Sequence, residues 1–286
     1  MYSTVHGVVS NMTIHFACTM CGKCCHDLRL PLAVDEAIDW LTRGGEVQIL
    51  CDAIPWPSEP PANDALAQHR RRRSFAARSG ALPLRVTVTL VAAFAGACPH
   101  LRADMSCGAY ESRPRVCRIY PAELNPSHAL DPSMKACPPE AWAVGGRLFL
   151  RAGRIVDHDT AALIAQSRSA DVLDRQAKIR MCVMLGIRSA ALANEGFAIY
   201  SPPRERLLHA LQSSAFDGLT DDFASPLSPF SWHIVTNRLA SLTTLRSLNA
   251  HASAVTEAEA TANHTYHGFF EDDICAPSPG ADRSAV

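Results

Sequence analysis

Cysteine is the residue type whose spacing in this 286-residue chain most directly predicts chemistry. The densest cluster is Cys18-Thr-Met-Cys21-Gly-Lys-Cys24-Cys25. Two-residue gaps allow the sulfur atoms of a tightly wrapped loop to point at one centre, and Gly22 lets the backbone of such a loop adopt positive φ. In a reducing compartment, thiols clustered in this way bind metal or carry out redox chemistry. The motif therefore predicts a metal site.

Cysteines further along the chain can complete the ligand set. Cys98 and Cys137 are each followed by proline, which is the remote pattern that accompanies a CxxCxxC run in ferredoxin-type clusters. Cys107 and Cys117 bound a third block between them. A set of four cysteines suits zinc and iron–sulfur clusters alike, so spacing alone leaves the metal open.

Eight cysteines exceed the needs of one four-ligand site. Either two centres exist, or some of the thiols pack or carry out redox chemistry. Cys24 and Cys25 are adjacent, and side chains of neighbouring residues diverge, so one of the two could face a second centre. Cys51, Cys182 and Cys275 lie outside the pattern and are interpreted as ordinary buried or tail thiols.

Taken in order, these motifs resemble the CxxCxxCC cysteine-cluster family, whose members are described as zinc- or iron-chelating. The family pattern is CxxCGxCC, a Cys-Pro, then C-x-x-Y-x-x-R-P-x-x-C-R-x-[FY]-P and a further cysteine. All of these elements occur between Cys18 and Cys137. The resemblance implies that the metal ligands are Cys18, Cys21, Cys24, Cys25, Cys98, Cys107, Cys117 and Cys137.

The family also suggests an activity. It includes bacterial flagellin lysine N-methylases, which look like iron–sulfur-dependent methyl-transfer proteins. The resemblance thus implies an iron–sulfur cluster, with [4Fe–4S] favoured, or another iron centre, in a methylase-like enzyme that modifies a peptide or protein. No catalytic residue is assigned. The alternative is a non-catalytic zinc-binding or metal-handling module, in which thiolates supply folding energy.

Four charged or aromatic side chains surround the third block. Arg113 and Arg118 flank Cys117 and could donate hydrogen bonds to thiolate sulfur, offsetting the negative charge of a metal–thiolate centre. The alternative is that both arginines pair with surface carboxylates. Tyr110 and Tyr120 are candidate neighbours of the metal ligands. The alternative is that both pack in the core.

Positive charge is concentrated in the middle of the chain. The formal net charge is −1, but the segment 68–118 carries +8. We expect this Arg-rich segment to receive an anionic peptide or protein substrate. The run Arg70–Arg73 is the candidate contact, with a solvated loop as the alternative. Nucleic acid is not favoured, because no aromatic residues are interleaved with the arginines.

The elements that position these residues predict an α+β fold: an irregular cysteine-cluster domain with a few short strands, followed by a helical C-terminal portion. Periodicity predicts a helix over 34–43, an irregular loop over 51–67 and a strand over 84–90. Two short segments, 147–151 and 154–156, predict a hairpin.

In the C-terminal half, Ser201 and Pro202 predict a helix N-cap and its first residue. Helical spacing predicts two buried stripes, formed by Trp232, Val235, Leu239, Leu242 and Leu245 and by Val172, Ile179, Val183 and Ile187. The predicted organisation is a metal-binding domain over 1–157, a helical region over 158–262 and a flexible tail over 263–286.

Composition excludes several classes of protein. With 48% hydrophobic and 19% charged residues the chain is neither disordered nor fibrous. No apolar run approaches the roughly 20 residues that a membrane-spanning helix needs. The N-terminal residues lack the features of a signal peptide, and the cysteine count is odd. A secreted disulfide framework is therefore disfavoured, and we expect a cytoplasmic protein without a membrane segment, whose oligomeric state the sequence does not indicate.

Overall fold

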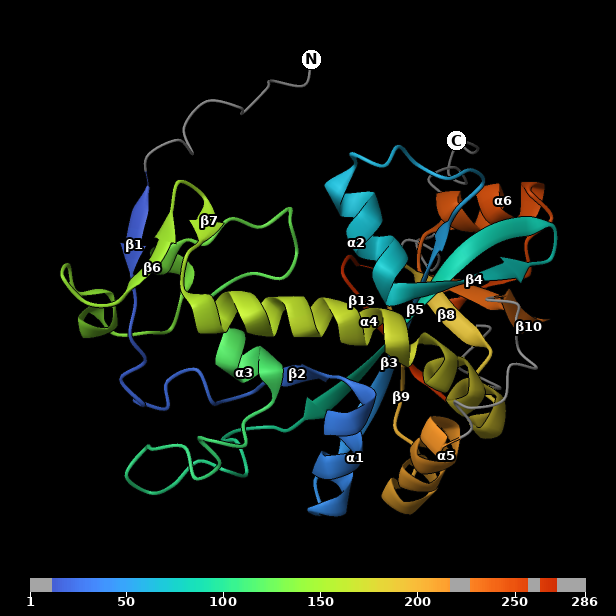
Figure 1. Cartoon of the computed structure of the whole chain (residues 1–286). Coiled ribbons are helices and arrows are strands. Elements are labelled where there is room, and N and C mark those ends of the chain that lie inside the picture. Colours follow the sequence, from blue (N-terminus) through green and yellow to red (C-terminus); the bar gives the residue numbers. More distant parts are fainter. Residues whose placement is uncertain (1–11, 217–226, 257–262, 272–286) are drawn as a thin grey trace, which may run out of the picture. The chain divides into compact units, whose positions relative to one another are not determined.

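A computed structural model describes residues 12–216, 227–256 and 263–271 (Figure 1). Helices and strands are mixed along the chain, which confirms the predicted α+β class. The chain divides into two compact units whose segments alternate in the sequence, whereas the sequence interpretation divided it once near residue 157. Unit 1 comprises Met1–Val47, Pro61–Arg72 and Leu90–Arg175, and unit 2 comprises Gln48–Pro60, Arg73–Thr89 and Gln176–Val286.

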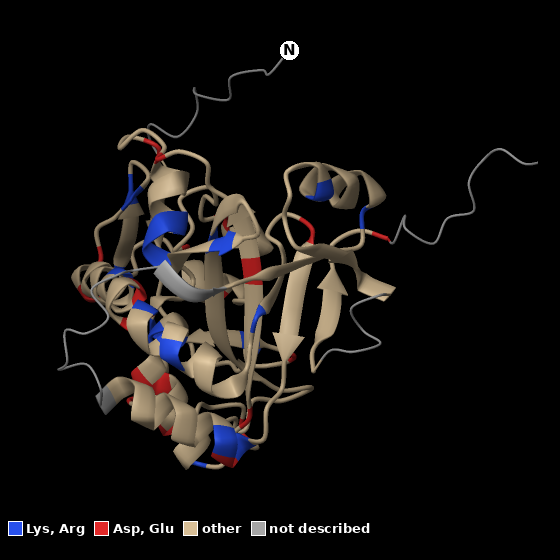
Figure 2. Cartoon of the chain, turned by 90° about the vertical axis from the view of Figure 1, so that its right-hand side faces the viewer, with Lys and Arg blue, Asp and Glu red and all other residues tan. Residues whose placement is uncertain are grey.

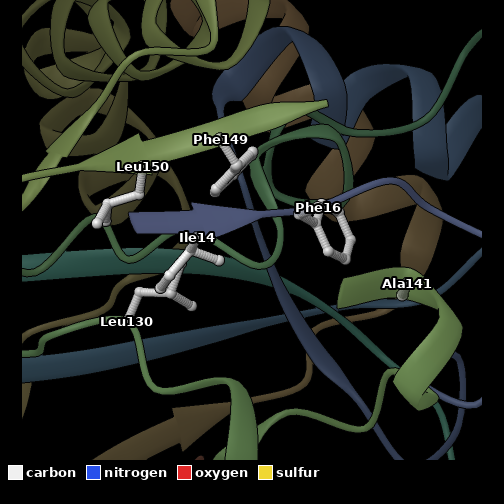
Figure 3. Close-up of a cluster of buried hydrophobic side chains, with 6 residues drawn as sticks. All are labelled: Ile14, Phe16, Leu130, Ala141, Phe149 and Leu150. Atoms are coloured by element: carbon white, nitrogen blue, oxygen red, sulfur yellow. The ribbon is translucent and has the colours of Figure 1, made fainter. Parts of the chain in front are cut away.

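Unit 1 contains a small antiparallel sheet formed by β1 (Thr13–His15), β6 (Leu148–Arg151) and β7 (Arg154–Ile155). The predicted hairpin is confirmed, and its turn residues Ala152 and Gly153 have φ of 48° and 73°. Positive φ at both positions is what a two-residue hairpin loop of type I′ requires. Side chains from β1 and β6 pack with the 3-10 helix η2 (Pro139–Trp142) into one buried cluster (Figure 3). It consists of Ile14, Phe16, Leu130, Ala141, Phe149 and Leu150.

The other elements of unit 1 surround the cysteine segments. Strand β2 (Arg29–Leu32) pairs with residues 90–93 of β5 (Leu82–Ala93) and leads into α1 (Val34–Thr42). The predicted helix over 34–43 is confirmed, with Gly44 at φ 89° beyond its end. The remaining helices are α2 (Ala65–Arg73), α3 (Arg115–Ile119), η1 (Pro132–Met134) and the first part of α4 (His158–Leu185).

Unit 2 contains most of a mixed sheet. Its parallel part runs in the order β3 (Val47–Pro55), β8 (Ser189–Leu192), β11 (His233–Thr236) and β12 (Ala252–Ala254). The other strands are β4 (Ser74–Ser79), most of β5, β9 (Gly196–Tyr200), β10 (Leu227–Ser231) and β13 (Thr265–Gly268). Helices α5 (Arg204–Phe216) and α6 (Leu239–Ser247) complete the unit.

Two predictions in the first half need comment. The strand predicted over 84–90 is confirmed and extends to 82–93. The irregular loop predicted over 51–67 is wrong at both ends, because residues 51–55 continue β3 and α2 begins at Ala65. The four prolines of that segment favoured a loop. The run Ile49–Ile54 nevertheless forms a strand, because neighbouring strands pair with it on both sides.

The helix predicted to begin at Ser201 begins instead at Arg204. Pro203 restricts Pro202 to extended backbone, so the helix starts after both prolines. The hydroxyl of Ser201 accepts a hydrogen bond from Gln48 at 3.2 Å instead of capping a helix.

One predicted helical stripe in the C-terminal half is partly a strand. Trp232 and Val235 are buried as predicted, but Val235 lies on β11 and the helix begins only at Leu239. In the other stripe Val172 and Val183 are exposed rather than buried. The region predicted as helical also holds strands β8 to β12.

The end of the chain contains one element that the sequence interpretation missed. Residues 265–268, assigned to a tail, form β13 and pair with β9. Residues 272–286 lie outside the described part of the chain. Within the described ranges, none of the helices has the length and apolar character needed to cross a membrane.

Candidate metal centre

The loop that carries the first four cysteines is fixed at its start and in its middle. The N–H of Ala17 donates to the carbonyl of Ala141 at 2.9 Å, which anchors the loop where it leaves β1. Gly22 has φ 67°, and a Cβ at this position would lie 2.6 Å from the carbonyl oxygen of Met105. Glycine is therefore required here both for its backbone conformation and for the close approach.

A second segment is hydrogen-bonded to the end of this loop. The N–H of Cys98 donates to the carbonyl of Cys25 at 2.8 Å, next to an isolated antiparallel bridge between His26 and Ala97. A further bridge joins Leu101 to Cys107. These backbone contacts bring Cys25, Cys98 and Cys107 into one neighbourhood.

Cys117 lies on α3, a short helix whose start is held from another element. Pro114 precedes the helix without a side-chain cap. The carboxylate of Glu36, on α1, accepts the backbone N–H of Arg115 at 2.6 Å and thus satisfies a donor that the helix leaves unpaired. At the other end of α3, Ile119 is buried against Leu163 and Ile164 of α4. Cys117 is thereby placed by contacts at both ends of its helix.

The last cysteine of the pattern is tied to α3 through Tyr120. The Tyr120 hydroxyl accepts the N–H of Ala136 at 3.1 Å. Burial raises the pKa of the Cys137 thiol, and a hydrogen bond between Tyr120 and Cys137 acts against this rise. Burial and the neighbouring Cys137 raise the pKa of Tyr120 above its usual value. Tyr120 is therefore a neutral hydrogen-bonding partner of this cysteine.

Burial and mutual repulsion act against deprotonation of the clustered thiols. Seven of the eight are partly buried, and Cys18 is exposed. Burial, followed by the proximity of Cys25, raises the pKa of Cys24 to about 12. Burial likewise raises the pKa of Cys117 to about 12, with Cys98 contributing next. A metal cation at these sulfur atoms would favour the thiolate forms, because metal binding displaces the thiol protons.

All eight thiols lie in unit 1. A donor set made of sulfur alone fits a metal that prefers sulfur ligands. As the side chains are placed, no three Cys, His, Asp or Glu residues in the described part of the chain stand close enough together to hold a metal ion. The Sγ atoms of Cys24 and Cys25 are 4.0 Å apart. Metal binding thus requires the cysteine side chains to rotate, while the backbone already brings their segments together. The set of ligands stays a prediction.

The two arginines near Cys117 differ in their surroundings. The guanidinium of Arg113 lies 3.7 Å from the centre of the Tyr110 ring, and its Nε donates to the Tyr110 carbonyl at 2.8 Å. Burial and Cys98 raise the pKa of Cys117, and the charge of Arg113 opposes this rise. Arg118 is exposed and does not contribute to this shift. Tyr110 holds Arg113 in place, and the role predicted for Arg118 has no such support.

Two features of this region were missed by sequence reasoning. Glu36 supports α3, yet its only sequence signal is an acidic residue in the first turn of α1. An open pocket of about 540 Å³ is lined by polar and apolar residues, among them Asp35, Arg115 and Asp174. Asp174 accepts the N–H of Val34 at 2.9 Å, and Asp35 pairs with Arg115 at 2.7 Å. The cavity therefore presents carboxylates and one guanidinium beside the helix that carries Cys117.

The remaining cysteines do not join the cluster. Cys51 and Cys182 are fully buried in unit 2, as the sequence interpretation expected. Cys275 lies outside the described residues. The run Arg70–Arg73 is the candidate substrate contact, with a solvated loop as the alternative; it forms the end of α2 rather than a loop. Figure 2 shows that basic residues occur on several separate helices and strands.

Residues 17–138 match the family model CxxCxxCC, described as a "putative zinc- or iron-chelating domain". The matched segment contains all eight cysteines of the pattern, together with both arginines and both tyrosines around α3. Comparison of the chain with curated proteins and with solved structures finds no match. The resemblance inferred from the motifs is confirmed, and a metal-binding role of the cysteine cluster, for zinc or iron, follows from the family.

Proposed function

Since residues 17–138 form a CxxCxxCC domain, we propose that the chain holds iron in an iron–sulfur cluster and acts as a methylase-like enzyme on a peptide or protein. The observation that carries the metal part is the backbone network, which gathers eight thiols from four separate segments into unit 1. The donor set is all sulfur, as in iron–sulfur proteins.

Hydrogen bonds and charge around the sulfur atoms support a cluster over a plain structural ion. The backbone N–H of His100 donates to Cys98 and lowers the pKa of its thiol, against the larger effect of burial. Arg113 acts in the same direction on Cys117. Such contacts to sulfur tune the potential of an iron–sulfur cluster, because they stabilise its more negative state.

The cavity beside α3 supports the second part of the proposal. Arg115 belongs to the basic middle segment and lines the cavity together with Asp35 and Asp174. A peptide side chain that carries an amine would pair there with the carboxylates, and a backbone or side-chain carboxylate would pair with the guanidinium. These residues bind and orient a substrate, and the cluster would supply the redox chemistry when bound.

A second candidate function is a zinc module without catalysis. The part of unit 1 around β1 and β6 packs on a cluster of six buried residues. A structural metal held by the adjacent cysteine loop would add folding energy to this part of the unit. On this view the cysteines stabilise the fold and the cavity has no substrate.

Anaerobic purification of the full chain distinguishes the two candidates. We expect a brown protein with an absorption band near ~400 nm and matched amounts of iron and acid-labile sulfide. Cys21→Ser should lower both signals, whereas Cys51→Ala, which removes a buried thiol of unit 2, should leave them at the wild-type level. A colourless protein with stoichiometric zinc would refute the iron–sulfur proposal and favour the zinc module.

A further inference from the structure

We propose that the eight cysteines form two separate four-thiol metal sites rather than one centre. Site A consists of Cys18, Cys21, Cys24 and Cys137, and site B of Cys25, Cys98, Cys107 and Cys117. This partition rests on the proposed metal binding and deepens it, because it assigns each thiol to one of two metals. The two sites are neighbours, since the adjacent residues Cys24 and Cys25 have Sγ atoms 4.0 Å apart.

Site A is defined by contacts that join the start of the cysteine loop to the segment around Cys137. The N–H of Phe16 donates to the carbonyl of Arg147, and the N–H of Ala17 donates to that of Ala141, both at 2.9 Å. Cys137 itself packs against the cluster that contains Phe16. Cys18 therefore leaves β1 at the place where Cys137 enters the core of unit 1, and the short CxxCxxC loop adds Cys21 and Cys24.

Site B is defined by a different set of contacts at the other end of the loop. The N–H of Cys98 donates to the carbonyl of Cys25 at 2.8 Å, and the N–H of Asp27 donates to the carbonyl of Gly96 at the same distance. The bridge between Leu101 and Cys107 folds the following loop back on Cys98. Helix α3, which carries Cys117, packs against β2, which begins four residues after Cys25.

The sequence of the loop is suited to this division. A CxxCxxC run directs three sulfur atoms to one side of a wrapped loop, and a fourth cysteine placed directly after it exceeds that set. Cys25 is this extra residue, and its carbonyl already accepts the hydrogen bond from Cys98. A single tetrahedral site needs four thiols and would leave half of the gathered cysteines without a role.

Zinc stoichiometry of the full-length chain tests the partition. Metal-free protein is reconstituted with zinc alone, and bound zinc is measured after removal of the excess. We expect about two zinc ions per wild-type chain and about one in Cys21→Ser or in Cys107→Ser. The double variant should bind none, and Cys51→Ser, in unit 2, should match wild type. Circular dichroism checks that each variant is folded.

A second variant from each set guards against effects of one substitution on folding. Cys18→Ser should reproduce the stoichiometry of Cys21→Ser, and Cys98→Ser that of Cys107→Ser. One zinc per wild-type chain, or loss of all zinc in a single variant from each set, would overturn the partition while leaving metal binding intact. No zinc in the wild type, and no iron after anaerobic reconstitution, would overturn both the partition and the proposed function.

Discussion

Glu36 links α1 to the helix that carries Cys117, and its removal gives the sharpest test of how the metal region is held. One carboxylate oxygen accepts the N–H of Ala33 at 2.9 Å, and the other accepts the N–H of Arg115 at 2.6 Å. The second oxygen also lies 3.2 Å from Nε of Arg115, and the Glu36 side chain is only 16% exposed. Glu36→Ala removes all three contacts at once.

The cost can be worked out from these contacts. A hydrogen bond to a charged group contributes about 1.5 to 3 kcal/mol. Of the two hydrogen bonds only the one to Arg115 reaches α3, because Ala33 precedes α1. The ion pair adds little to this energy, because Arg115 keeps its partner Asp35 in the variant. We expect local opening of α3 to become easier by about 2 kcal/mol, which corresponds to a roughly thirty-fold faster exchange of its amide hydrogens.

The assay is amide hydrogen exchange of the metal-free chain, followed over α1 and α3. The matched control is Asp35→Asn, because Asp35 is 73% exposed and contacts Arg115 through an exposed ion pair alone. That variant should change exchange by less than about tenfold. If Glu36→Ala accelerates exchange of α3 no more than Asp35→Asn does, the carboxylate does not hold this helix and the reasoning is refuted.

Two further predictions concern the cysteine loop and the arginines. Gly22→Ala should destabilise the chain by more than about 1 kcal/mol, because it adds a clash with Met105 to the cost of positive φ. Gly96→Ala, at φ 71° with nothing within 4 Å, should show the smaller backbone cost alone, and equal effects on thermal unfolding would contradict the close approach. Arg113→Lys should lower metal occupancy or shift the cluster potential, because an ammonium cannot reproduce the stacked guanidinium. Arg118→Ala should match wild type in both measurements. If Arg118→Ala has the larger effect and Arg113→Lys none, Arg118 rather than Arg113 supports the metal site.

Elements defined by local signals could be predicted from the sequence. The helix α1 was predictable because its apolar residues repeat with helical spacing and Gly44 follows its end. The stripe that includes Trp232 and Val235 failed for a physical reason. A spacing of three residues fits a helix, but Val235 is held in β11 by parallel pairing with β8 and β12, which no local pattern reveals.

Part of the candidate site could be predicted from local sequence, and part depends on contacts between distant residues. The cysteines are recognisable by residue type and spacing, so the set could be predicted without the fold. Glu36 could not, because the N–H that it accepts belongs to Arg115, 79 residues further along the chain. The partition into two sites depends equally on distant contacts such as Ala17 with Ala141, which only the folded backbone supplies.

The structure also narrows what the basic middle segment can do. Arg85 is buried and donates to Ser74, so it serves the fold of unit 2. Arg115 pairs with two carboxylates, and Arg113 is stacked on an aromatic ring beside a cysteine. Arg113 and Arg115 thus balance a thiol and carboxylates of the chain itself. An anionic partner, if one binds to this segment, would contact the arginines at the end of α2, and replacing those four residues should weaken its binding while leaving metal content unchanged.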